Sequence, residues 1–336
     1  MNRARGVFVA SLCAVAVLTG CGSIHSVESP VVVKRTQMHM GTLVSITTVA
    51  PSQEIAQASI EAGFREIKRL EQLFSTWIPT SELSQVNAAA GREPVVVGPE
   101  TLELVSRSLE MARLTEGGFN IAVGPAVEAW SVTERERIPT REELQSLRLL
   151  VDWTMINIDS QARTIFLPKP GMRIDVGGIG KGYAADRAVD VMRKMGAKGG
   201  VVALSGDIKT FGDLPGMQGF PVGIRHPRQE GALIATVDLK NEAISTAGDY
   251  ERYFEREGVR YHHILDPKSL QPARQCQSVT VIAAEGTVAD GLDTGIFVLG
   301  PEKGMALVEQ LPDVEAIIID DLGHIAVSSG LRSRLR

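Results

Sequence analysis

The segment 173–183 is the strongest local constraint in this 336-residue chain, because four of the six residues from 177 to 182 are glycine and favour a loop with closely approaching backbone. The segment leads directly into an expected helix that runs from about Gly182 to Met195. Glycines let backbone atoms approach a bound group closely, and the amides at a helix N-terminus attract anions. With the positive charge of Lys181 beside them, these glycines indicate a site for an anion such as a pyrophosphate.

The spacing of this segment excludes two common phosphate-binding loops. Asp175 stands where a Walker loop needs its first glycine, and Lys181 is followed by Gly182 instead of Ser or Thr. The spacing of a dinucleotide-binding fingerprint is also absent. Glycines before a helix are often simple turn residues, so this segment alone leaves a phosphate site and a turn as alternatives.

A second segment, 287–297, carries oxygen ligands at helical spacing. On a helix, Asp290, Asp293 and Thr294 share one face, so two carboxylates and a hydroxyl converge. Oxygen donors without a thiolate or an imidazole suit a hard cation such as Mg²⁺. Thr287 followed by Asp290 also fits a helix capping box, and the spacing leaves both interpretations open.

A third segment, 260–267, contains the neighbouring histidines His262 and His263. Neighbouring side chains on a strand point to opposite faces, so these two cannot chelate one ion together. One can be buried and structural while the other acts as a general base, since imidazole titrates near neutral pH. The segments 245–250 and 116–120 read as turns and do not by themselves indicate a function.

Helical and strand-forming segments follow one another without a strict alternating rhythm. Apolar residues recur at helical spacing from Ile60 to Phe74 behind the potential cap Ser52, and a further helix begins at Pro99 and stops at the glycine pair 117–118. Short β-rich segments are expected at residues 43–49, 201–204, 220–224, 234–239, 262–265, 279–283 and 316–319. We therefore expect an α/β chain of mixed α+β type instead of a doubly wound parallel sheet.

The N-terminus is typical of a lipoprotein signal sequence. Two arginines precede the apolar run 6–18, which is too short to span a bilayer stably, and small residues lead from it to Cys21. An ordinary secretory signal and an N-terminal anchor helix are the alternatives. We expect a signal peptide at residues 1–20, acylation of Cys21, a lipidated tether at residues 21–35 and a folded domain at residues 36–330.

The charge and the cysteines of the chain argue against a nucleic-acid partner and against a disulfide framework. The formal net charge of −5 becomes −7 without residues 1–20, which hold two arginines and no acids, and no basic stripe is interleaved with aromatic residues. A nucleic-acid partner is therefore not expected, and the basic segment 331–336 is expected to be a solvated tail. Of the three cysteines, Cys13 leaves with the signal and Cys21 is acylated, so Cys276 has no disulfide partner.

Taken in order, these segments resemble the ApbE-like flavin transferases over about residues 40–300. The resemblance implies that family's two-lobed α/β body, related to the T-fold, with FAD in the cleft between the lobes. It rests on the whole set of motifs: Met40-Gly41-Thr42, Ser75-Thr76-Trp77 with Ser81-Glu82-Leu83 and Asn87, Gly118-Phe119, Asp175 with Gly180-Lys181-Gly182-Tyr183, Gly248-Asp249-Tyr250, His263-Ile264-Leu265-Asp266-Pro267, and Ala289-Asp290 with Asp293-Thr294.

The resemblance also implies roles for individual residues. This chain departs from the family at Asn120, where the family usually has Asp, and at Ala247, where it usually has Ser. The first departure replaces a charged nucleotide contact by an amide, and the second removes a hydroxyl near the site. The implied FAD contacts are Met40, Trp77, Gly118, Phe119, Asn120, Asp175, Lys181 and Ile264, and the implied Mg²⁺ ligands are the Gly178 carbonyl, Asp290, Asp293 and Thr294.

The activity implied is Mg²⁺-dependent FAD:protein FMN transfer. A threonine of an acceptor protein attacks the riboflavin-linked phosphorus of FAD and AMP leaves. We expect His263 to take the hydroxyl proton, with His262 as the fallback, and Lys181 to stabilise the leaving phosphate.

The resemblance further implies acceptors in membrane redox subunits, and the signal implies a lipid-anchored protein of the bacterial cell envelope that faces the periplasm from the outer or inner membrane. The alternatives to a transferase are an FAD pyrophosphatase, in which water replaces the threonine, and a non-catalytic flavin-binding lipoprotein.

Overall fold

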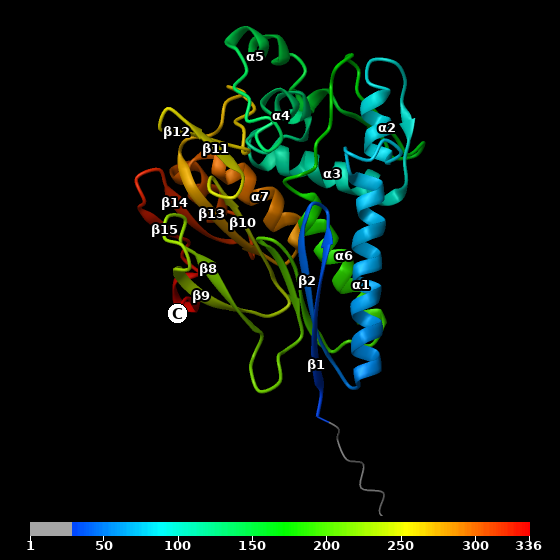
Figure 1. Cartoon of the computed structure of the whole chain (residues 1–336), viewed down its shortest axis with the longest axis vertical. Coiled ribbons are helices and arrows are strands. Elements are labelled where there is room, and N and C mark those ends of the chain that lie inside the picture. The colour runs from blue at the N-terminus through cyan, green and yellow to red at the C-terminus, as the bar shows by residue number, and fades with distance from the viewer. Residues whose placement is uncertain (1–28) are drawn as a thin grey trace, which may run out of the picture.

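An eight-stranded sheet forms the centre of the chain in the computed structural model, which describes residues 29–336 (Figure 1). Every neighbouring pair of strands is antiparallel. The expected mixed α+β class is confirmed. In spatial order the strands are β1 (Val31–His39), β2 (Thr42–Ala50), β6 (Gly199–Leu204), β7 (Asp207–Phe211), β10 (Ala243–Gly248), β13 (Cys276–Ala283), β14 (Glu315–Asp320) and β15 (Ile325–Val327).

The two faces of this sheet contribute to two separate cores. In β14, Ala316 and Ile318 point into the large core on the helical face, whereas Ile317 and Ile319 point into a smaller core on the other face. A hairpin of β8 (Phe220–Arg225) and β9 (Leu233–Leu239) contributes apolar side chains to the smaller core. Because both faces are covered, β14 carries the apolar run 316–319, and β13 is buried along nearly all of its length.

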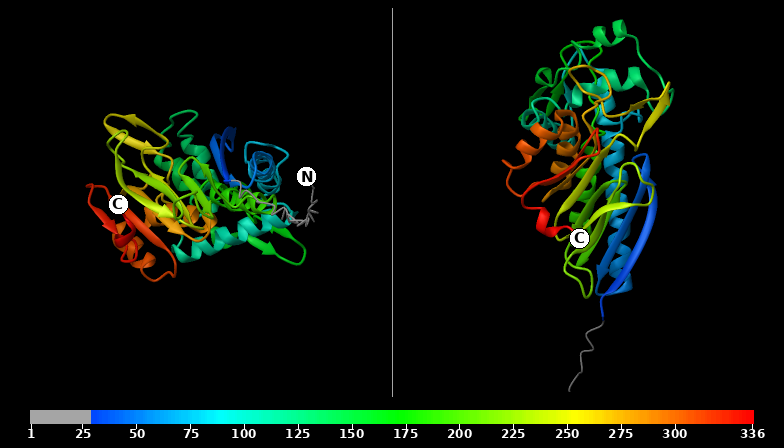
Figure 2. Two further views of the ribbon diagram at one scale, coloured as in Figure 1. Left: turned by 90° about the horizontal axis from the view of Figure 1, so that it is seen from below. Right: turned by 90° about the vertical axis from the view of Figure 1, so that its left-hand side faces the viewer.

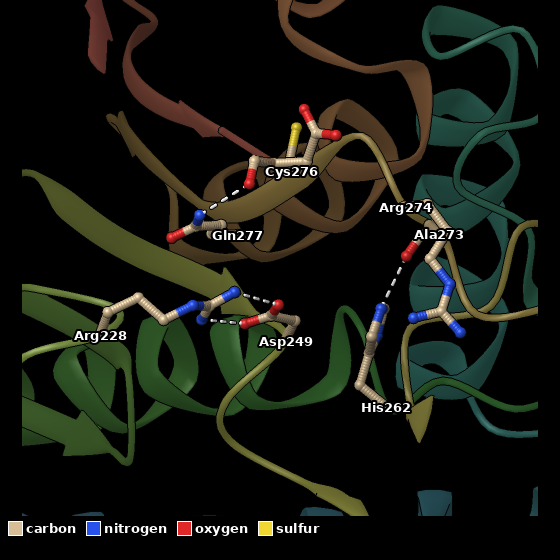
Figure 3. Close-up of a pocket in the computed structure, with 8 residues that line it drawn as sticks. Arg228, Asp249, His262, Ala273, Arg274, Cys276 and Gln277 are labelled. Atoms are coloured by element: carbon tan, nitrogen blue, oxygen red, sulfur yellow. Dashed lines mark hydrogen bonds and ion pairs between the residues drawn. The ribbon is translucent and has the colours of Figure 1, made fainter. Parts of the chain in front are cut away.

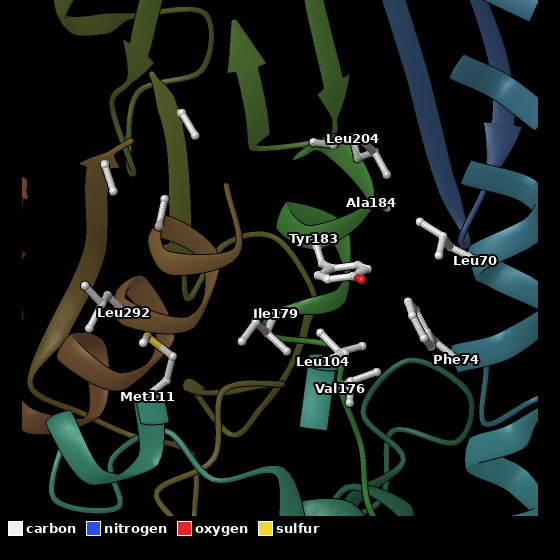
Figure 4. Packing of buried hydrophobic residues seen from close by; sticks show 14 of the residues in the cluster. Leu70, Phe74, Leu104, Met111, Val176, Ile179, Tyr183, Ala184, Leu204 and Leu292 are labelled. Atoms are coloured by element: carbon white, nitrogen blue, oxygen red, sulfur yellow. The ribbon is translucent and has the colours of Figure 1, made fainter. Parts of the chain in front are cut away.

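Three helices cover the helical face and pack on one another: α1 (Gln53–Phe74), α6 (Gly180–Lys194) and α7 (Gly286–Leu299). Ser52 caps α1 as predicted, because its hydroxyl oxygen accepts the Ile55 N–H at 3.3 Å. At the other end of α1, the ring of Phe74 meets the ring of Tyr183 in α6 edge-on, with centroids 5.7 Å apart (Figure 4). A fourth helix, α3 (Pro99–Leu114), begins at the predicted proline and supplies Leu104 to the same core (Figure 4).

The smaller elements gather mainly at one end of the molecule, where α4, α5 and the β11–β12 hairpin lie (Figures 1 and 2). Trp130 and Phe254 belong to a third apolar core there, which ties α4 to the hairpin. The smaller helices are α2 (Glu82–Ala88), α4 (Gly124–Trp130), α5 (Arg141–Leu147), α8 (Pro301–Val308) and the 3₁₀ turns η1 (Ile121–Val123), η2 (Trp153–Met155) and η3 (Arg332–Arg334). The smaller strands are β3 (Val95–Val96), β4 (Asn157–Asp159), β5 (Thr164–Phe166), β11 (Tyr253–Arg256) and β12 (Val259–His262).

Helices α6 and α7 cap each other where their N-terminal turns meet. Asp290 of α7 accepts the N–H of Gly182 in α6 at 2.8 Å. In return, Asp186 of α6 accepts the N–H groups of Gly286 and Thr287 in α7 at 2.8 and 2.9 Å. Each helix therefore supplies the carboxylate that satisfies free amides at the start of the other.

Of the two interpretations left open for Thr287 and Asp290, the capping box is contradicted, because both side chains have partners on α6. The Thr287 hydroxyl donates to Asp186 at 2.8 Å, and the Asp290 carboxylate is used by Gly182. The two backbones touch at this point: a Cβ at Gly182 would lie 2.1 Å from the Gly286 carbonyl oxygen. The glycine at position 182 is therefore required by helix packing as well as by any bound anion.

Three expectations about local structure are corrected. The segment 245–250, which reads as a turn in the sequence, belongs to the central strand β10 as far as Gly248 and pairs there with β13. The predicted strand 262–265 is only the end of β12, which stops at His262; beyond it, Leu265 forms an isolated bridge with Pro272. The basic segment 331–336 is not a solvated tail, since its backbone pairs with β9 and Leu331 is buried in the smaller core. The folded body thus continues to the last residue.

At the N-terminus, the predicted signal peptide and Cys21 lie outside the described residues. The predicted tether 21–35 overlaps β1, whose Val31 pairs with Ala50, so the folded body starts at Val31 instead of residue 36. Within residues 29–336, no helix combines the length and the apolar composition needed to cross a bilayer. Cys276, the one cysteine within this range, is free and buried.

The Gly182→Ala substitution should lower the free energy of unfolding by about 3 kcal/mol or more, since a methyl group has no room against the Gly286 carbonyl and would push α6 from α7. Gly180→Ala is the matched control in the same helix, because a Cβ there makes only ordinary contacts, the nearest at 3.6 Å. Urea unfolding of both variants measures the difference. Equal stabilities would contradict the close packing of the two helices.

Candidate functional site

Three buried carboxylates converge where α7 crosses the central sheet. Asp207 is the first residue of β7, and Asp290 and Asp293 lie on the face of α7 that packs against the strands. One oxygen from each of these three side chains lies within 4.8 Å of the others. The predicted helical spacing of Asp290 and Asp293 therefore does bring them together, and Asp207 joins them from a different part of the chain.

A network of hydrogen bonds fixes the three carboxylates. Lys181 forms an ion pair with one oxygen of Asp207. The Ser245 hydroxyl lies within hydrogen-bonding distance of the other Asp207 oxygen and, at 2.6 Å, of Asp293. The Thr294 hydroxyl donates to the second oxygen of Asp293 at 3.1 Å. The glycine-rich loop and α7 are thus connected through side chains.

The cluster holds three carboxyl groups and one ammonium group, so full ionisation would leave it with surplus negative charge. Burial raises the pKa of Asp290 to about 7, with Asp207 adding to the effect, and burial followed by repulsion from Asp290 raises the pKa of Asp293 well above its usual range. Burial opposes the charge of Lys181, but the attraction of the three carboxylates outweighs it and raises the pKa of the ammonium group. One ammonium cannot balance three carboxylates, so this donor set fits a hard divalent cation.

Two further expected metal ligands lie beside the carboxylates. A Cβ at Gly178 would come within 3.0 Å of the Thr294 hydroxyl oxygen and 3.3 Å of the Phe119 ring. The structure therefore brings Gly178, Thr294 and Phe119 into contact at the start of α6. The predicted set Gly178, Asp290, Asp293 and Thr294 is one spatial group, to which the structure adds Asp207.

Sequence reasoning missed Asp207. It directly follows the predicted strand at 201–204 and the pair Ser205-Gly206, so an acidic residue at a hairpin turn was the available signal. Nothing in the linear sequence links that hairpin to α7, because the neighbourhood arises only when β7 and β10 pair.

Several residues implied in FAD contacts surround the same loop. Met40 lies in the turn between β1 and β2 with a positive φ of 50°, and its methyl group reaches to 3.9 Å from the Cβ position of Gly180. Asp175 accepts the Gly177 N–H at 2.8 Å and so shapes the loop. Gly118 lies against α7, since a Cβ there would be 2.8 Å from the Gly295 carbonyl oxygen.

The other implied FAD contacts differ in their surroundings. Trp77 follows α1 and is 77% exposed, so its ring is available to stack on a flat ligand. The Asn120 side-chain oxygen accepts the Ala122 N–H at 2.8 Å and caps η1. An Asp would make the same cap, so this departure from the family preserves the local structure. Ile264 is buried, and its N–H donates to a ring nitrogen of His262 at 3.3 Å.

His263 presents a neutral imidazole. Its Nδ1 lies 3.2 Å from the carbonyl oxygen of Arg252, which can only accept, so Nδ1 carries the hydrogen and Nε2 keeps its lone pair. Burial lowers the pKa of His263 to about 3, with further contributions from Arg252, His262 and Lys181. At neutral pH this side chain is therefore an uncharged proton acceptor.

His262 and Asp249 line a separate cavity of about 180 Å³ (Figure 3). His262 Nε2 donates to the Ala273 carbonyl oxygen at 2.7 Å, and burial lowers the pKa of His262 to about 4. The Asp249 carboxylate is held by Arg228 through two hydrogen bonds of 2.7 and 2.6 Å (Figure 3). Both side chains are already committed to structural contacts, which makes them poor alternatives to His263.

The chain resembles known proteins along most of its length. Residues 40–318 match the model of the ApbE family. An FAD:protein FMN transferase of Klebsiella pneumoniae (strain 342) is 34% identical over 274 residues, covering 81% of this chain and 85% of the relative. A protein of the same name from Treponema pallidum (strain Nichols) is 33% identical over 349 residues, covering 98% and 94%.

Solved structures agree with this relationship. The ApbE protein of Thermotoga maritima superimposes with a TM-score of 0.84 at 33% identity and covers 91% of this chain and 99% of its own. The apo form of the Pseudomonas stutzeri flavinyl transferase ApbE gives a TM-score of 0.80 at 28% identity, covering 91% and 97%. Because the match includes both the glycine-rich loop and the acidic face of α7, this chain belongs to the ApbE family.

Proposed function

We propose that this chain is an FAD:protein FMN transferase that uses Mg²⁺ to attach FMN to a threonine of a redox protein. The observation that carries the proposal is the buried cluster of Asp207, Asp290 and Asp293 next to Lys181 and the N-terminus of α6. Such a site holds a divalent cation and an anion side by side. The relatives named FAD:protein FMN transferase support the same assignment.

The residues around the cluster suit the binding of a diphosphate. Asp290, Asp293, Asp207 and Thr294, with the Gly178 carbonyl, would hold Mg²⁺, which when bound neutralises charge on diphosphate oxygens. Lys181 and the amides at the start of α6 favour the anion and stabilise the leaving phosphate of AMP. The exposed ring of Trp77 and the half-buried Met40 would offer apolar surface to the rest of the FAD molecule.

His263 supplies the proton acceptor. The threonine oxygen of the acceptor protein forms a bond to the riboflavin-linked phosphorus, the bond from that phosphorus to the bridging oxygen breaks, and AMP leaves with the electron pair. The hydroxyl proton passes to Nε2 of His263, which is free because Nδ1 donates to the Arg252 carbonyl. Water in place of the threonine would make the same site an FAD pyrophosphatase.

The test is AMP release from FAD with Mg²⁺, measured with and without a co-expressed acceptor domain whose mass is then determined. Transfer predicts AMP release that requires the acceptor, together with an FMN-sized mass increase on one threonine. Release without the acceptor would instead identify a pyrophosphatase. FAD binding with no AMP release in either case would identify a flavin-binding protein.

We also propose that the protein is anchored by acylated Cys21 and faces the periplasm. With β1 starting at Val31, residues 21–30 would be the tether between lipid and folded body. Cys21→Ser should leave transfer activity intact in solution and abolish sedimentation with membranes, because two or more acyl chains are needed for stable anchoring. Cell fractionation measures this, and a Cys21→Ser protein that stays with the membranes would refute the anchor.

Asp293→Asn should lower Mg²⁺-dependent transfer by at least about a hundredfold. Loss of a residue that only orients a metal ligand already costs about 10–100-fold in affinity or activity, and Asp293 is proposed to be a ligand itself. The free energy of unfolding should hold or rise, since burial and repulsion from Asp290 disfavour the charged form of Asp293 in the folded protein and an amide carries no charge. Asp293 is a cleaner test than Asp290, which also caps α6.

The control for this substitution is Asp190→Asn, which removes a carboxylate that is paired with Arg187 on the surface of α6. It should change neither activity nor stability appreciably. Activity and thermal unfolding are measured in parallel for both variants. An Asp293→Asn protein that loses stability while it keeps Mg²⁺-dependent activity would mean that the cation binds elsewhere.

His263→Ala should reduce transfer by ~10²–10⁴-fold, the contribution of a general base, while FAD binding stays close to that of the unchanged protein. Fluorescence quenching of FAD and acceptor flavinylation measured by mass separate the two effects. Because the pKa of His263 is about 3, its imidazole stays uncharged at pH 5.5, so a loss of transfer at that pH should come from protonation of Asp290, whose pKa is raised to about 7, and excess Mg²⁺ should restore it.

The neighbouring histidine is the control. His262→Ala removes a buried hydrogen bond to Ala273 and the edge-on contact with Phe297, so it should cost about 1–3 kcal/mol of stability. It should affect FAD binding and transfer together. Full transfer by a folded His263→Ala protein would eliminate the proposed base.

A further inference from the structure

Ser245 occupies the one position in the described cluster where a single side chain touches two of the carboxylates. Its hydroxyl oxygen is within hydrogen-bonding distance of Asp207 and lies 2.6 Å from Asp293. Asp207 comes from β7 and Asp293 from α7, so Ser245 on β10 connects a strand and a helix that are distant in the sequence. The side chain is 1% exposed and is therefore shielded from solvent.

The strand geometry explains why this position is open to a polar group. β7 and β10 pair only at Ala243 and Ile244, and Ser245 is the next residue of β10. The pairing ends one residue before Asp207, so Ser245 and Asp207 lie next to each other where the paired stretch stops. Since α7 packs directly on β10, Ser245 also reaches Asp293 of α7.

The hydrogen bonds form one continuous series from the glycine-rich loop to α7. Lys181 pairs with one oxygen of Asp207, Thr294 donates to one oxygen of Asp293, and the single hydrogen of the Ser245 hydroxyl can be donated to the remaining oxygen of either carboxylate. Ser245 is the uncharged link at the centre of this series. Both outer groups, Lys181 and Thr294, lie at the places where the proposed function puts the phosphate and the cation.

We infer that Ser245 is a positioning residue, whose hydroxyl holds Asp207 and Asp293 close together and correctly oriented for one divalent cation. The inference rests on the metal site of the proposed function. Two carboxylates in a buried site repel each other, and a hydroxyl between them offsets that repulsion through a hydrogen bond. Without the Ser245 hydroxyl, Asp207 would be held by Lys181 alone and Asp293 by Thr294 alone. The carboxylate oxygens that would bind the cation would then move apart.

The experiment measures binding of Mn²⁺, a substitute for Mg²⁺, to the purified full-length protein by calorimetry, without FAD or acceptor. Ser245→Ala should weaken the Mn²⁺ Kd by about 10–100-fold, as loss of an outer-sphere partner does. Ser245→Thr keeps the hydroxyl, so its Mn²⁺ Kd should stay within about threefold of that of the unchanged protein. This change is much smaller than the one expected when an outer-sphere partner is lost. A role confined to stability would not produce this difference in metal affinity.

Thr280→Val is the matched control. Thr280 is also buried, and its hydroxyl bonds to Thr246 at 2.9 Å on the face of the sheet opposite to Ser245. This variant loses a buried hydrogen bond of the same kind without touching the carboxylates, so its Mn²⁺ Kd should not change. If Ser245→Ala fails to fold, Ser245→Cys keeps the size of the side chain with a weaker donor and should show the same loss of affinity.

A folded Ser245→Ala or Ser245→Cys protein with unchanged Mn²⁺ affinity would overturn the inference and leave the proposed function intact. Equal losses in Ser245→Ala and Thr280→Val would overturn it as well, because the effect would then be general. Absence of Mn²⁺ binding by the unchanged protein would remove the metal site of the proposed function and this inference with it. Normal Mn²⁺ binding that Ser245→Ala weakens, in a protein without transferase activity, would support Ser245 and refute only the transferase.

Discussion

The reciprocal capping of α6 and α7 is the interaction on which the rest of the site depends. Asp290 satisfies an amide of α6 and Asp186 satisfies two amides of α7, while Gly182 and Gly286 let the two backbones touch. The crossing places the glycine-rich loop against the acidic face of α7. The acidic cluster and the N-terminus of α6 become neighbours because the two helices begin at the same place, which would let a cation and an anion bind side by side.

Partners around the crossing of α6 and α7 explain how three acidic side chains can be buried here. A buried carboxylate is expensive unless it is hydrogen-bonded and paired, and each of the three has such partners. Asp290 has the Gly182 amide, Asp207 has Lys181, and Asp293 has two hydroxyl groups. These partners do not neutralise all three carboxylates when they are ionised. A bound divalent cation would therefore stabilise their charged forms.

The two neighbouring histidines differ in the hydrogen bonds of their ring nitrogens. His262 and His263 are adjacent in sequence, yet the first is fixed by the Ala273 carbonyl beside Phe297, and the second bonds through Nδ1 and keeps Nε2 available. Both have a lowered pKa because burial disfavours the imidazolium. What distinguishes them is the partner of the second ring nitrogen, which a sequence does not reveal.

The sequence by itself determined the long helices α1, α3 and α6, six of the strands and the local groups of functional residues, because periodicity, caps and glycine spacing act over a few residues. Asp290 and Asp293 were predictable as one group since a single helix turn relates them. Asp207, Ser245 and the exchange of caps between helices depended on tertiary structure, because they join residues from β7, β10, α6 and α7. Thr287 and Asp290 illustrate the limit: a locally satisfactory capping box was replaced by contacts with α6, since the crossing of two helices offered both side chains partners that the local sequence does not contain.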